Sequence, residues 1–246
     1  MFKTTKIETD SDLTVKPIDN NSKDLIKQPK LSQENVIPKL LTSSLIVGRS
    51  GSGKSILMNF MLNNKGMFSG WFDLIVLISP TCNTDDVQMS FGADECVDDL
   101  DEADNFLKQL MILQKEKIEE YGAEHSPKLC IVFDDVIGHK FLNSSSFTAC
   151  FTRSRHYNFT VFCLSQQYKS IPKKCRLQAN NLMFFKSSDT ETQCVVDDYT
   201  PPNFNKLKFL KMIKEANGDD HSFLYINMKE PFTKRYRKNF DEIIEI

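Results

Sequence analysis

The sequence predicts an α/β fold in which helices cover both faces of a mostly parallel β-sheet. Short apolar runs alternate along the chain with stretches of helical spacing. The runs are continuous and do not alternate apolar and polar residues, which is typical of strands buried on both faces. The length of 246 residues is enough for one sizeable domain of this class.

The expected elements follow one another in order. Strands are expected at 41–47, 72–78, 129–133, 159–164 and 182–185. Apolar residues on one face predict a helix over 99–121 and a Lys-rich helix over 203–217. In the second helix we expect Phe204, Leu207, Leu210 and Ile213 to face inward. The segments 222–228 and 232–237 resemble a terminal hairpin.

The polar N-terminal segment differs in composition from the rest of the chain. Residues 1–38 are rich in Lys, Asp, Asn, Ser and Thr and have few consecutive apolar positions. Such a segment buries too little surface to offset its ordering entropy. It is therefore predicted to be a flexible arm, with a strand at the domain edge as the alternative. Residues 39–246 are predicted to form one domain that ends in a short helix and hairpin.

Composition and charge exclude several classes of protein. The 31 Lys and Arg nearly balance the 33 Asp and Glu, which excludes a generally basic coat. The seven cysteines are scattered without a CxxC pair, which argues against a zinc site and indicates a reducing compartment. No run approaches the roughly 18 apolar residues of a membrane span, and the N-terminus lacks a signal-peptide core. We expect an intracellular protein with no membrane partner.

Residues 48–55 read GRSGSGKS and match the phosphate-binding pattern GxxxxGK[ST] at every fixed position. The loop follows an apolar strand and precedes an apolar-faced helix, the context that a P-loop requires. Its backbone N–H groups and the helix N-terminus are suited to bind a triphosphate. Lys54 would reach the β- and γ-phosphates, and the Ser55 hydroxyl would ligate Mg²⁺. The predicted nucleotide-binding residues are Gly48, Arg49, Ser50, Gly51, Ser52, Gly53, Lys54 and Ser55.

Two acids, Asp134 and Asp135, follow the apolar run 129–133. In P-loop proteins a carboxylate at such a strand end holds Mg²⁺ together with the loop Ser, and Asp134 is the candidate. Asp135 stands where many P-loop ATPases have a glutamate that orients or deprotonates the attacking water. Asp is shorter by one methylene, roughly 1.5 Å, so hydrolysis is slow unless the loop or a water compensates. The alternative is a pair of surface acids that end a strand.

Polar amides follow the run 159–164 at Gln166 and Gln167. Ligands of open α/β sheets bind at the carboxyl ends of strands, so a side-chain amide there is placed to contact the γ-phosphate or the attacking water. Gln166 is nearer the strand and is the candidate. The other interpretation is a strand-capping Gln with no ligand contact.

A basic block without any Asp or Glu extends over 140–186, whereas 85–104 is acidic. Arginine is suited to stabilise charge on a transferring phosphoryl group, from its own or a neighbouring subunit. Arg153 and Arg155 are the candidates, Arg176 is the alternative, and a solvated basic face is the other interpretation. Further basic residues at 206–214 and 234–238 are candidates for contact with the DNA backbone. The alternative is that the helical lysines form the solvent-exposed side of an amphipathic helix.

The series of motifs resembles a known family. It consists of the P-loop, the Asp-Asp strand end, TRSRHYNFTVFCLSQQY at 152–168, IPKKCR at 171–176 and NNLMFFK at 180–186. The series is similar to the poxvirus-type genome-packaging ATPases of the FtsK/HerA superfamily, especially the short forms of virophages and related large-DNA-virus elements. The resemblance covers about residues 40–200. It implies an additional-strand P-loop fold and a ring, often hexameric, that moves double-stranded DNA into a preformed capsid.

The resemblance also implies roles for individual residues. Lys54 and Ser55 match the family's phosphate and metal residues, and Asp134 and Asp135 match its strand-three acids. Gln166 matches the strand-four glutamine, and Arg153 or Arg155 matches the basic pair, of which one arginine would act on the next subunit's site.

The expected function is therefore an ATP-hydrolysing DNA packaging motor, with ATP and Mg²⁺ as cofactors. Its expected partners are double-stranded DNA, further copies of itself and a capsid or portal component, in the infected host cell. The short Asp135 side chain motivates an alternative, a nucleotide-gated switch or adaptor with little turnover. A small-substrate kinase would need an Arg-rich lid, and the region after the second strand is acidic instead.

Overall fold

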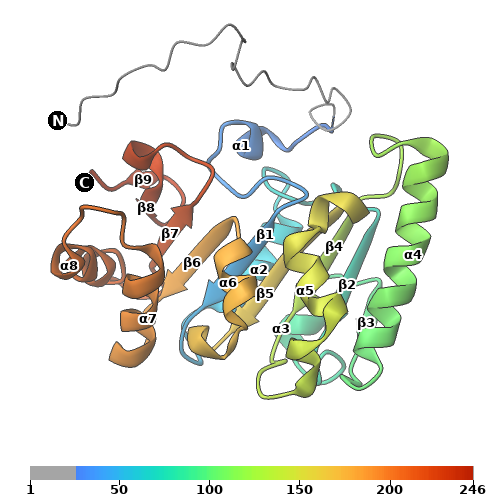
Figure 1. Ribbon diagram of the computed structural model, residues 1–246, viewed down its shortest axis with the longest axis horizontal. Helices are drawn as coiled ribbons and strands as arrows, with labels where there is room; N and C mark the ends of the chain where they lie inside the picture. The colour runs from blue at the N-terminus through green and yellow to red at the C-terminus, as the bar shows by residue number, and fades with distance from the viewer. Residues whose placement is uncertain (1–25, 246) are drawn as a thin grey trace, which may run out of the picture.

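The computed structural model describes residues 26–245, whose strands form a single twisted sheet (Figure 1). The order across the sheet is β3-β2-β4-β5-β1-β6-β7-β8-β9. The strands are β1 (Ser43–Val47), β2 (Leu74–Ile78), β3 (Glu95–Val97), β4 (Leu129–Phe133), β5 (Phe159–Ser165), β6 (Asn181–Phe185), β7 (Phe223–Asn227), β8 (Tyr236–Lys238) and β9 (Glu242–Ile243). From β3 to β6 every pairing is parallel, and from β6 to β9 every pairing is antiparallel.

The central strands give the sheet the additional-strand arrangement. β5 lies between β1 and β4 and pairs with both of them, so that Val47 is in register with Ser165 and Phe133 with Cys163. The strand that leads into residues 48–55 is thus separated by one inserted strand from β4, which Asp134 follows. The predicted fold class, a mostly parallel sheet of this type, is confirmed.

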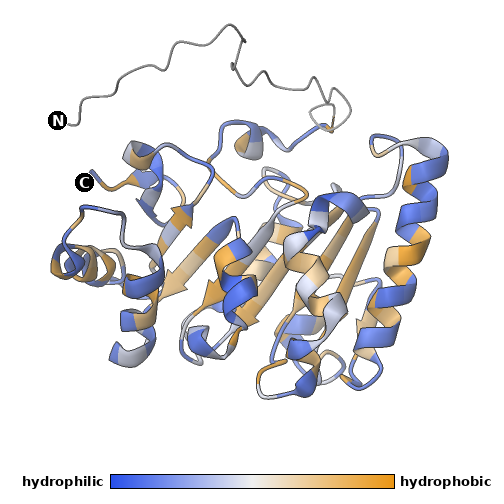
Figure 2. Cartoon of the chain, viewed as in Figure 1, coloured by the Kyte–Doolittle hydropathy of each residue, from blue (hydrophilic) through white to orange (hydrophobic). Residues whose placement is uncertain are grey.

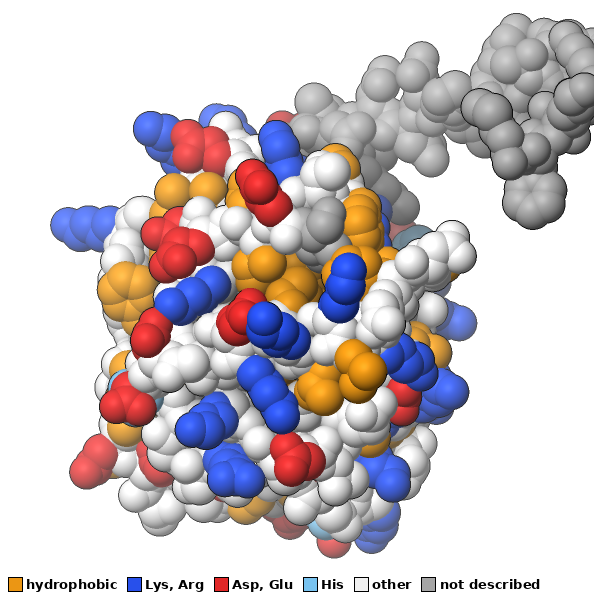
Figure 3. All heavy atoms as spheres, turned by 90° about the vertical axis from the view of Figure 1, so that its left-hand side faces the viewer, with side chains coloured by type: hydrophobic (Ala, Val, Ile, Leu, Met, Phe, Trp, Pro, Cys, Tyr) orange, Lys and Arg blue, Asp and Glu red, His pale blue; other side chains and the backbone are white. Residues whose placement is uncertain are grey.

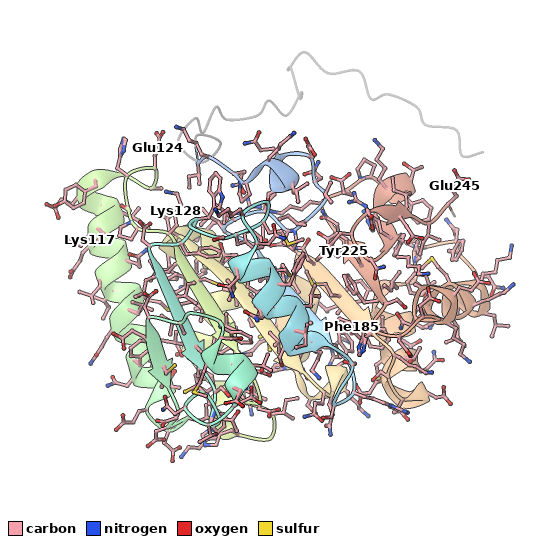
Figure 4. The ribbon with its side chains drawn as sticks, turned by 180° about the vertical axis from the view of Figure 1, so that it is seen from behind. Lys117, Glu124, Lys128, Phe185, Tyr225 and Glu245 are labelled. Carbon is pink, nitrogen blue, oxygen red and sulfur yellow. The ribbon has the colours of Figure 1, made fainter. Side chains whose placement is uncertain are left out.

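Helices cover both faces of the sheet, as predicted (Figures 1 and 4). One face packs against α4 (Ala103–Tyr121), α5 (Ser145–Thr152), α6 (Lys173–Gln178), α7 (Asp189–Tyr199) and α8 (Lys206–Ala216). The other face packs against α2 (Lys54–Asn63), the residues around α3 (Asp86–Met89) and the segment that holds α1 (Lys30–Gln33). Successive strand residues alternate between the two cores, as Ile131 and Val132 do. Figure 2 accordingly shows apolar strands inside and polar outer helix surfaces.

Phenylalanine rings fill much of the first core, which lies between the sheet and helices α4 to α8. Phe147 on α5 contacts Phe133, Phe141 and Phe151, with ring centroids 4.9, 5.5 and 5.2 Å away. Cys130 and Cys163, interpreted from the sequence as small buried hydrophobes, are 0% and 1% exposed. No helix within residues 26–245 is long and apolar enough to cross a membrane.

The structure differs from the expectation in the Lys-rich helix. Leu207 is 75% exposed, whereas Phe209, Met212, Ile213 and Ala216 are buried. The expected inward set repeats every three residues, and a helix turns once in 3.6 residues. Such a set drifts around the helix, so only part of it faces the core.

The boundary of the N-terminal arm also differs. Residues 1–25 lie outside the described part of the chain, but 26–38 contact the domain. Ile26 and Ile37 are 5% and 0% exposed in the second core, and the Ser32 hydroxyl donates to the Pro38 carbonyl at 2.8 Å. A few well-spaced apolar residues are enough to attach this segment, despite its polar composition. The expected terminal hairpin is formed by β7 and β8, with the short helix η4 (Phe232–Lys234) in the turn.

Candidate active site

The P-loop connects the buried strand β1 to helix α2. Gly51 and Gly53 have φ of +72° and +101°, which glycine adopts without strain. A Cβ on Gly48 would lie 2.6 Å from the Cβ of Phe185, so this position also requires glycine. The Gly48 amide donates to the Ser165 carbonyl at 3.1 Å, which ties the loop to the end of β5. The loop glycines are therefore required by backbone geometry.

Lys54 is the first residue of α2 and is 8% exposed. Its Nζ donates to the Arg49 carbonyl at 3.0 Å, within the same loop. Burial lowers the pKa of Lys54, and the nearby charges of Asp134 and Asp135 partly oppose this effect. A buried cation whose hydrogen-bond partner is a neutral carbonyl is well placed to bind an anion such as a phosphate.

Asp134 follows β4 and is 5% exposed. It accepts hydrogen bonds from the Gln88 side-chain amide at 3.1 Å and from the Asp135 backbone amide at 3.0 Å. Burial, and then the charge of Asp135, raise the pKa of Asp134 to about 6, although Lys54 opposes the shift. A cation at this carboxylate would relieve the cost of its burial.

Asp135 and Gln166 meet at the mouth of the site. The Gln166 Nε2 lies 3.4 Å from the Asp135 Oδ1, and both side chains are exposed. Asp135 has φ of +52°, a left-handed conformation that Asp tolerates better than most residues. Gln167 instead accepts from the Ser170 hydroxyl at 2.6 Å in the following turn and does not line the cavity. Of the two glutamines, Gln166 is therefore the one placed at the site.

These side chains surround one cavity of about 300 Å³ at the carboxyl ends of β1, β4 and β5. The structure adds three polar lining residues that sequence reasoning missed, which are Asp85, Gln88 and His221. Asp85 caps α3 by accepting from the Gln88 amide at 2.8 Å, a local pattern readable in the sequence. Gln88 and His221 have no such signal, because only the tertiary fold brings them to the P-loop.

His221 contacts the P-loop from the connection between α8 and β7. Its Nδ1 lies 3.2 Å from the Ser52 carbonyl oxygen, and a Cβ on Gly53 would lie 3.2 Å from the same nitrogen. A second cavity of about 340 Å³ begins at this imidazole and extends along α2. Its other lining residues are apolar apart from Gly53, namely Ile56, Leu57, Phe60, Phe185 and Phe223. Figure 4 shows Phe185 beside α2.

The oxygen ligands available at the site fit a magnesium ion. The Ser55 hydroxyl and the Asp134 carboxylate line the same cavity, and hard oxygen ligands suit Mg²⁺. Gln88 Oε1, on the side chain that contacts Asp134, is buried without a hydrogen-bond partner among the described residues. An unpaired acceptor beside a buried carboxylate fits a hydrated cation. These residues could therefore hold the magnesium ion that the sequence predicts, and the ion itself stays a prediction.

The predicted arginines lie elsewhere. Arg153 follows α5, and Arg155 lies in the short helix η2 (Ser154–Tyr157), where β5 begins. The P-loop is at the opposite ends of the parallel strands, roughly 16 Å away for a five-residue strand. Neither arginine lines the P-loop cavity. In this chain they are not part of the site around Lys54.

Arg176, the alternative arginine, has a structural role. Its side chain is 10% exposed and pairs with Asp198 at 3.2 Å. It also donates to the carbonyls of Lys169 and Ile171, both at 3.0 Å, and lies over the Tyr168 ring. An arginine with all these partners is held within its own subunit, which argues against a role at a neighbour's site.

The fold and the site together define a P-loop ATPase of the additional-strand class. The family model described as "Poxvirus A32 protein" matches residues 32–237. The chain therefore belongs to this family, and it is a viral genome-packaging ATPase. The resemblance deduced from the sequence is confirmed.

Solved structures show the same fold at low identity. The DNA-packaging ATPase B204 from Sulfolobus turreted icosahedral virus matches with a TM-score of 0.59 and 14% identity, covering 83% of this chain and 99% of that one. The genome packaging NTPase B204 from Sulfolobus turreted icosahedral virus 2, in complex with AMPPCP, matches with 0.57 and 15%, covering 80% and 96%. The cytoplasmic domain of the type VII secretion ATPase EccC from Thermomonospora curvata matches with 0.55 and 11%, covering 83% and 24%. Comparison with curated proteins gives no match.

Proposed function

We propose that this ATPase uses ATP and Mg²⁺ to move double-stranded DNA into a preformed capsid. The observation that carries the proposal is the cavity in which the P-loop, Asp134, Asp135 and Gln166 converge. The B204 structures with bound AMPPCP and ATP-gammaS support nucleotide as the ligand of this fold.

The site residues predicted from the sequence each have a definite task in this proposal. The backbone amides of 48–53 and the Lys54 ammonium bind the β- and γ-phosphates, for which Lys54 releases the Arg49 carbonyl. Ser55 and Asp134 would hold Mg²⁺, which neutralises charge on the phosphate oxygens. Asp135 orients the attacking water and accepts its proton, and the Gln166 amide donates to that water or to the γ-phosphate.

The nucleoside is proposed to occupy the apolar cavity along α2. This cavity shares Gly53, Ile56 and His221 with the phosphate cavity, so a bound triphosphate can extend directly into it. Ile56 and Phe60 are 61% and 52% exposed, although they are large and apolar. A flat base against these side chains would remove apolar surface from water.

An arginine from a neighbouring copy is proposed to complete the site. The described residues that line the P-loop cavity include Lys54 but no arginine. Arg153 or Arg155, at the opposite edge of the sheet, is the candidate to act on the next subunit, in a ring that is expected to be hexameric. A capsid or portal component, and action within the infected cell or in association with the virion, belong to the same proposal.

The second candidate function is a nucleotide-gated switch with little turnover. The observation behind it is that Asp135 is short and contacts Gln166 at the long distance of 3.4 Å. Single-site turnover below roughly 10⁻³ s⁻¹, the scale of slow intrinsic switch GTPases, would favour the switch over the motor.

The test is ATP hydrolysis by the full chain with and without duplex DNA. We expect DNA to stimulate the wild-type rate and Lys54→Ala to abolish hydrolysis, because the buried ammonium is lost. Lys65→Ala, at a lysine that does not line the cavity, is the matched control and should retain the wild-type rate. A rate that DNA leaves unchanged in an assembled preparation would contradict the motor.

A further inference from the structure

Three cationic side chains meet in a cavity at the edge of the sheet opposite the P-loop. The cavity has a volume of about 220 Å³ and is lined by Lys39, Arg155 and Lys229. Lys39 precedes β1, Arg155 precedes β5, and Lys229 follows β7. Because β7 runs antiparallel to β6, its end lies at the edge where β1 and β5 begin. Topology alone therefore collects these three residues from distant parts of the chain.

The three cations have no acidic partner in the described part of the chain. None of the ion pairs between described residues includes Lys39, Arg155 or Lys229. Glu124, next to the lining residue Ala123, is exposed beyond the end of α4 (Figure 4). Desolvation, followed by the charges of Arg155 and Lys39, lowers the pKa of Lys229 to about 8. Mutual repulsion of this kind is relieved when an anion binds.

A buried acceptor in the same cavity also lacks a partner. Asn158 is 0% exposed and lines the cavity, and its Oδ1 has no hydrogen bond among the described residues. Its Nδ2 donates to the carbonyls of Ala123 at 2.7 Å and Ser126 at 3.4 Å, which fixes the orientation of the amide. Buried acceptors are normally paired, so the cavity is suited to hold a ligand or water that donates to Asn158.

The lysines of α8 have a different environment. Lys206 pairs with Asp197 and Lys211 with Glu215. Figure 3, which views the molecule from the α8 side, shows acidic side chains interspersed among the basic ones. Lys39, Arg155 and Lys229, by contrast, line a common cavity.

We propose that Lys39, Arg155 and Lys229 form a second phosphate-binding site, with Asn158 accepting a hydrogen bond from the bound group or its water. Two sources can supply the phosphate, the backbone of duplex DNA or the terminal phosphate of a nucleotide on a neighbouring copy. The choice of source rests on the proposed function, whereas phosphate binding does not. The new element is that two lysines act with the arginine.

The first experiment is lysine acylation of the full chain, read by mass spectrometry. Three arms each contain one addition: a short blunt DNA duplex, a non-hydrolysable ATP analogue, or inorganic pyrophosphate. A fourth arm without any addition gives the unprotected rate. Lys30, which is on α1 and 86% exposed, is the internal reference. We expect at least a fivefold slower reaction of Lys39 and Lys229, relative to Lys30, in one or more of the three arms. Protection by duplex identifies DNA, and protection by the analogue that disappears in Lys54→Ala identifies a neighbour's nucleotide.

The second experiment measures duplex affinity against salt for a Lys39→Gln, Lys229→Gln double variant and for Lys30→Gln. Each lost phosphate contact lowers the slope of log affinity on log salt by about 0.9. If DNA is the source, the double variant loses up to about 2 from the slope. If a neighbour's nucleotide is the source, the slope is unchanged and the turnover falls. Lys30→Gln should match wild type in both the salt slope and the turnover.

The proposal is overturned if no arm protects Lys229 from acylation and the double variant keeps both the wild-type slope and the wild-type turnover. If the wild-type protein does not hydrolyse ATP, that result counts against the proposed function and not against the second site. Pyrophosphate binding at Lys39 and Lys229 can be measured without any ATP hydrolysis.

Discussion

Replacing Asp134 with Asn should stabilise the protein at neutral pH in the absence of nucleotide and metal. Burial, with the charge of Asp135 as the second cause, raises the pKa of this carboxyl from 3.8 to about 6. In the unfolded chain the carboxyl ionises near 3.8, so between these pH values the folded protein holds a proton that the unfolded chain has released. Stability therefore falls as the pH rises through this interval, and the loss is complete above about pH 6.

The size of the effect follows from the same shift. One pKa unit corresponds to about 1.4 kcal/mol, so the whole cost is about 3 kcal/mol above pH 6. Asn keeps an oxygen for the Asp135 amide, and its NH₂ group can pair with the unpaired Gln88 Oε1 after the Gln88 amide rotates. We expect Asp134→Asn to gain about 1–3 kcal/mol at about pH 7.5, which raises the Tm by roughly 3–9 °C. At about pH 4.5 the gain should shrink by about two thirds.

The assay is thermal and urea unfolding of both proteins in EDTA at the two pH values, with ATP hydrolysis measured separately. Hydrolysis should be lost, because a neutral amide is a poor magnesium ligand. Asp241→Asn, at an exposed position, is the control and should change neither quantity. The reasoning is refuted if Asp134→Asn is no more stable than wild type at neutral pH, or if its gain is the same at both pH values.

Three further substitutions test the site and its surroundings. Gln166→Ala should lower kcat at least tenfold with an unchanged fold, whereas Gln167→Ala should leave kcat within about twofold; equal losses would contradict the placement of Gln166. Arg176→Ala should destabilise the protein by about 2–4 kcal/mol in urea unfolding, because it leaves the half-buried Asp198 carboxylate without its cation and with only the Tyr168 hydroxyl as donor; a stable but inactive variant would contradict the structural role of this arginine. Gly53→Ala should weaken nucleotide binding in a calorimetric titration, because φ of +101° strains any residue with a Cβ; unchanged affinity would show that the loop tolerates the change.

The central strands of the fold could be predicted from the sequence better than the elements at its margins. Strands β4, β5 and β6 lie within a residue of the predicted runs, because continuous apolar segments between polar ones are a strong local signal. β3 and α7 were not predicted, because neither has a long apolar run: β3 is a short strand of exposed and half-buried residues, and α7 carries acids on its outer side. The inward face of α8 was misassigned because a period of three approximates a helix only over a short distance.

The candidate site shows the same limit. Lys54, Ser55, Asp134 and Gln166 follow from motifs that lie next to strands, since a parallel sheet brings strand ends together. His221 approaches the P-loop from a connection far along the chain, and its contact with Ser52 depends on how β7 pairs with β6. Arg176 carries the same charge as Arg155, and only its partners reveal that it is structural. Local patterns therefore find the reactive groups, and packing decides which of them are available.

The P-loop and Arg155 lie at opposite ends of the parallel strands. The proposed action of Arg155 on the next copy would therefore give each copy two unlike ends, one that provides the arginine and one that receives it. A contact between unlike ends cannot pair two copies symmetrically, because each contact leaves one end of each kind unused. Repetition of that contact must either return to the first copy or continue without limit. In a closed ring all copies have the same orientation about the ring axis. This shared orientation would give a linear polymer that passes through the ring a preferred direction of travel.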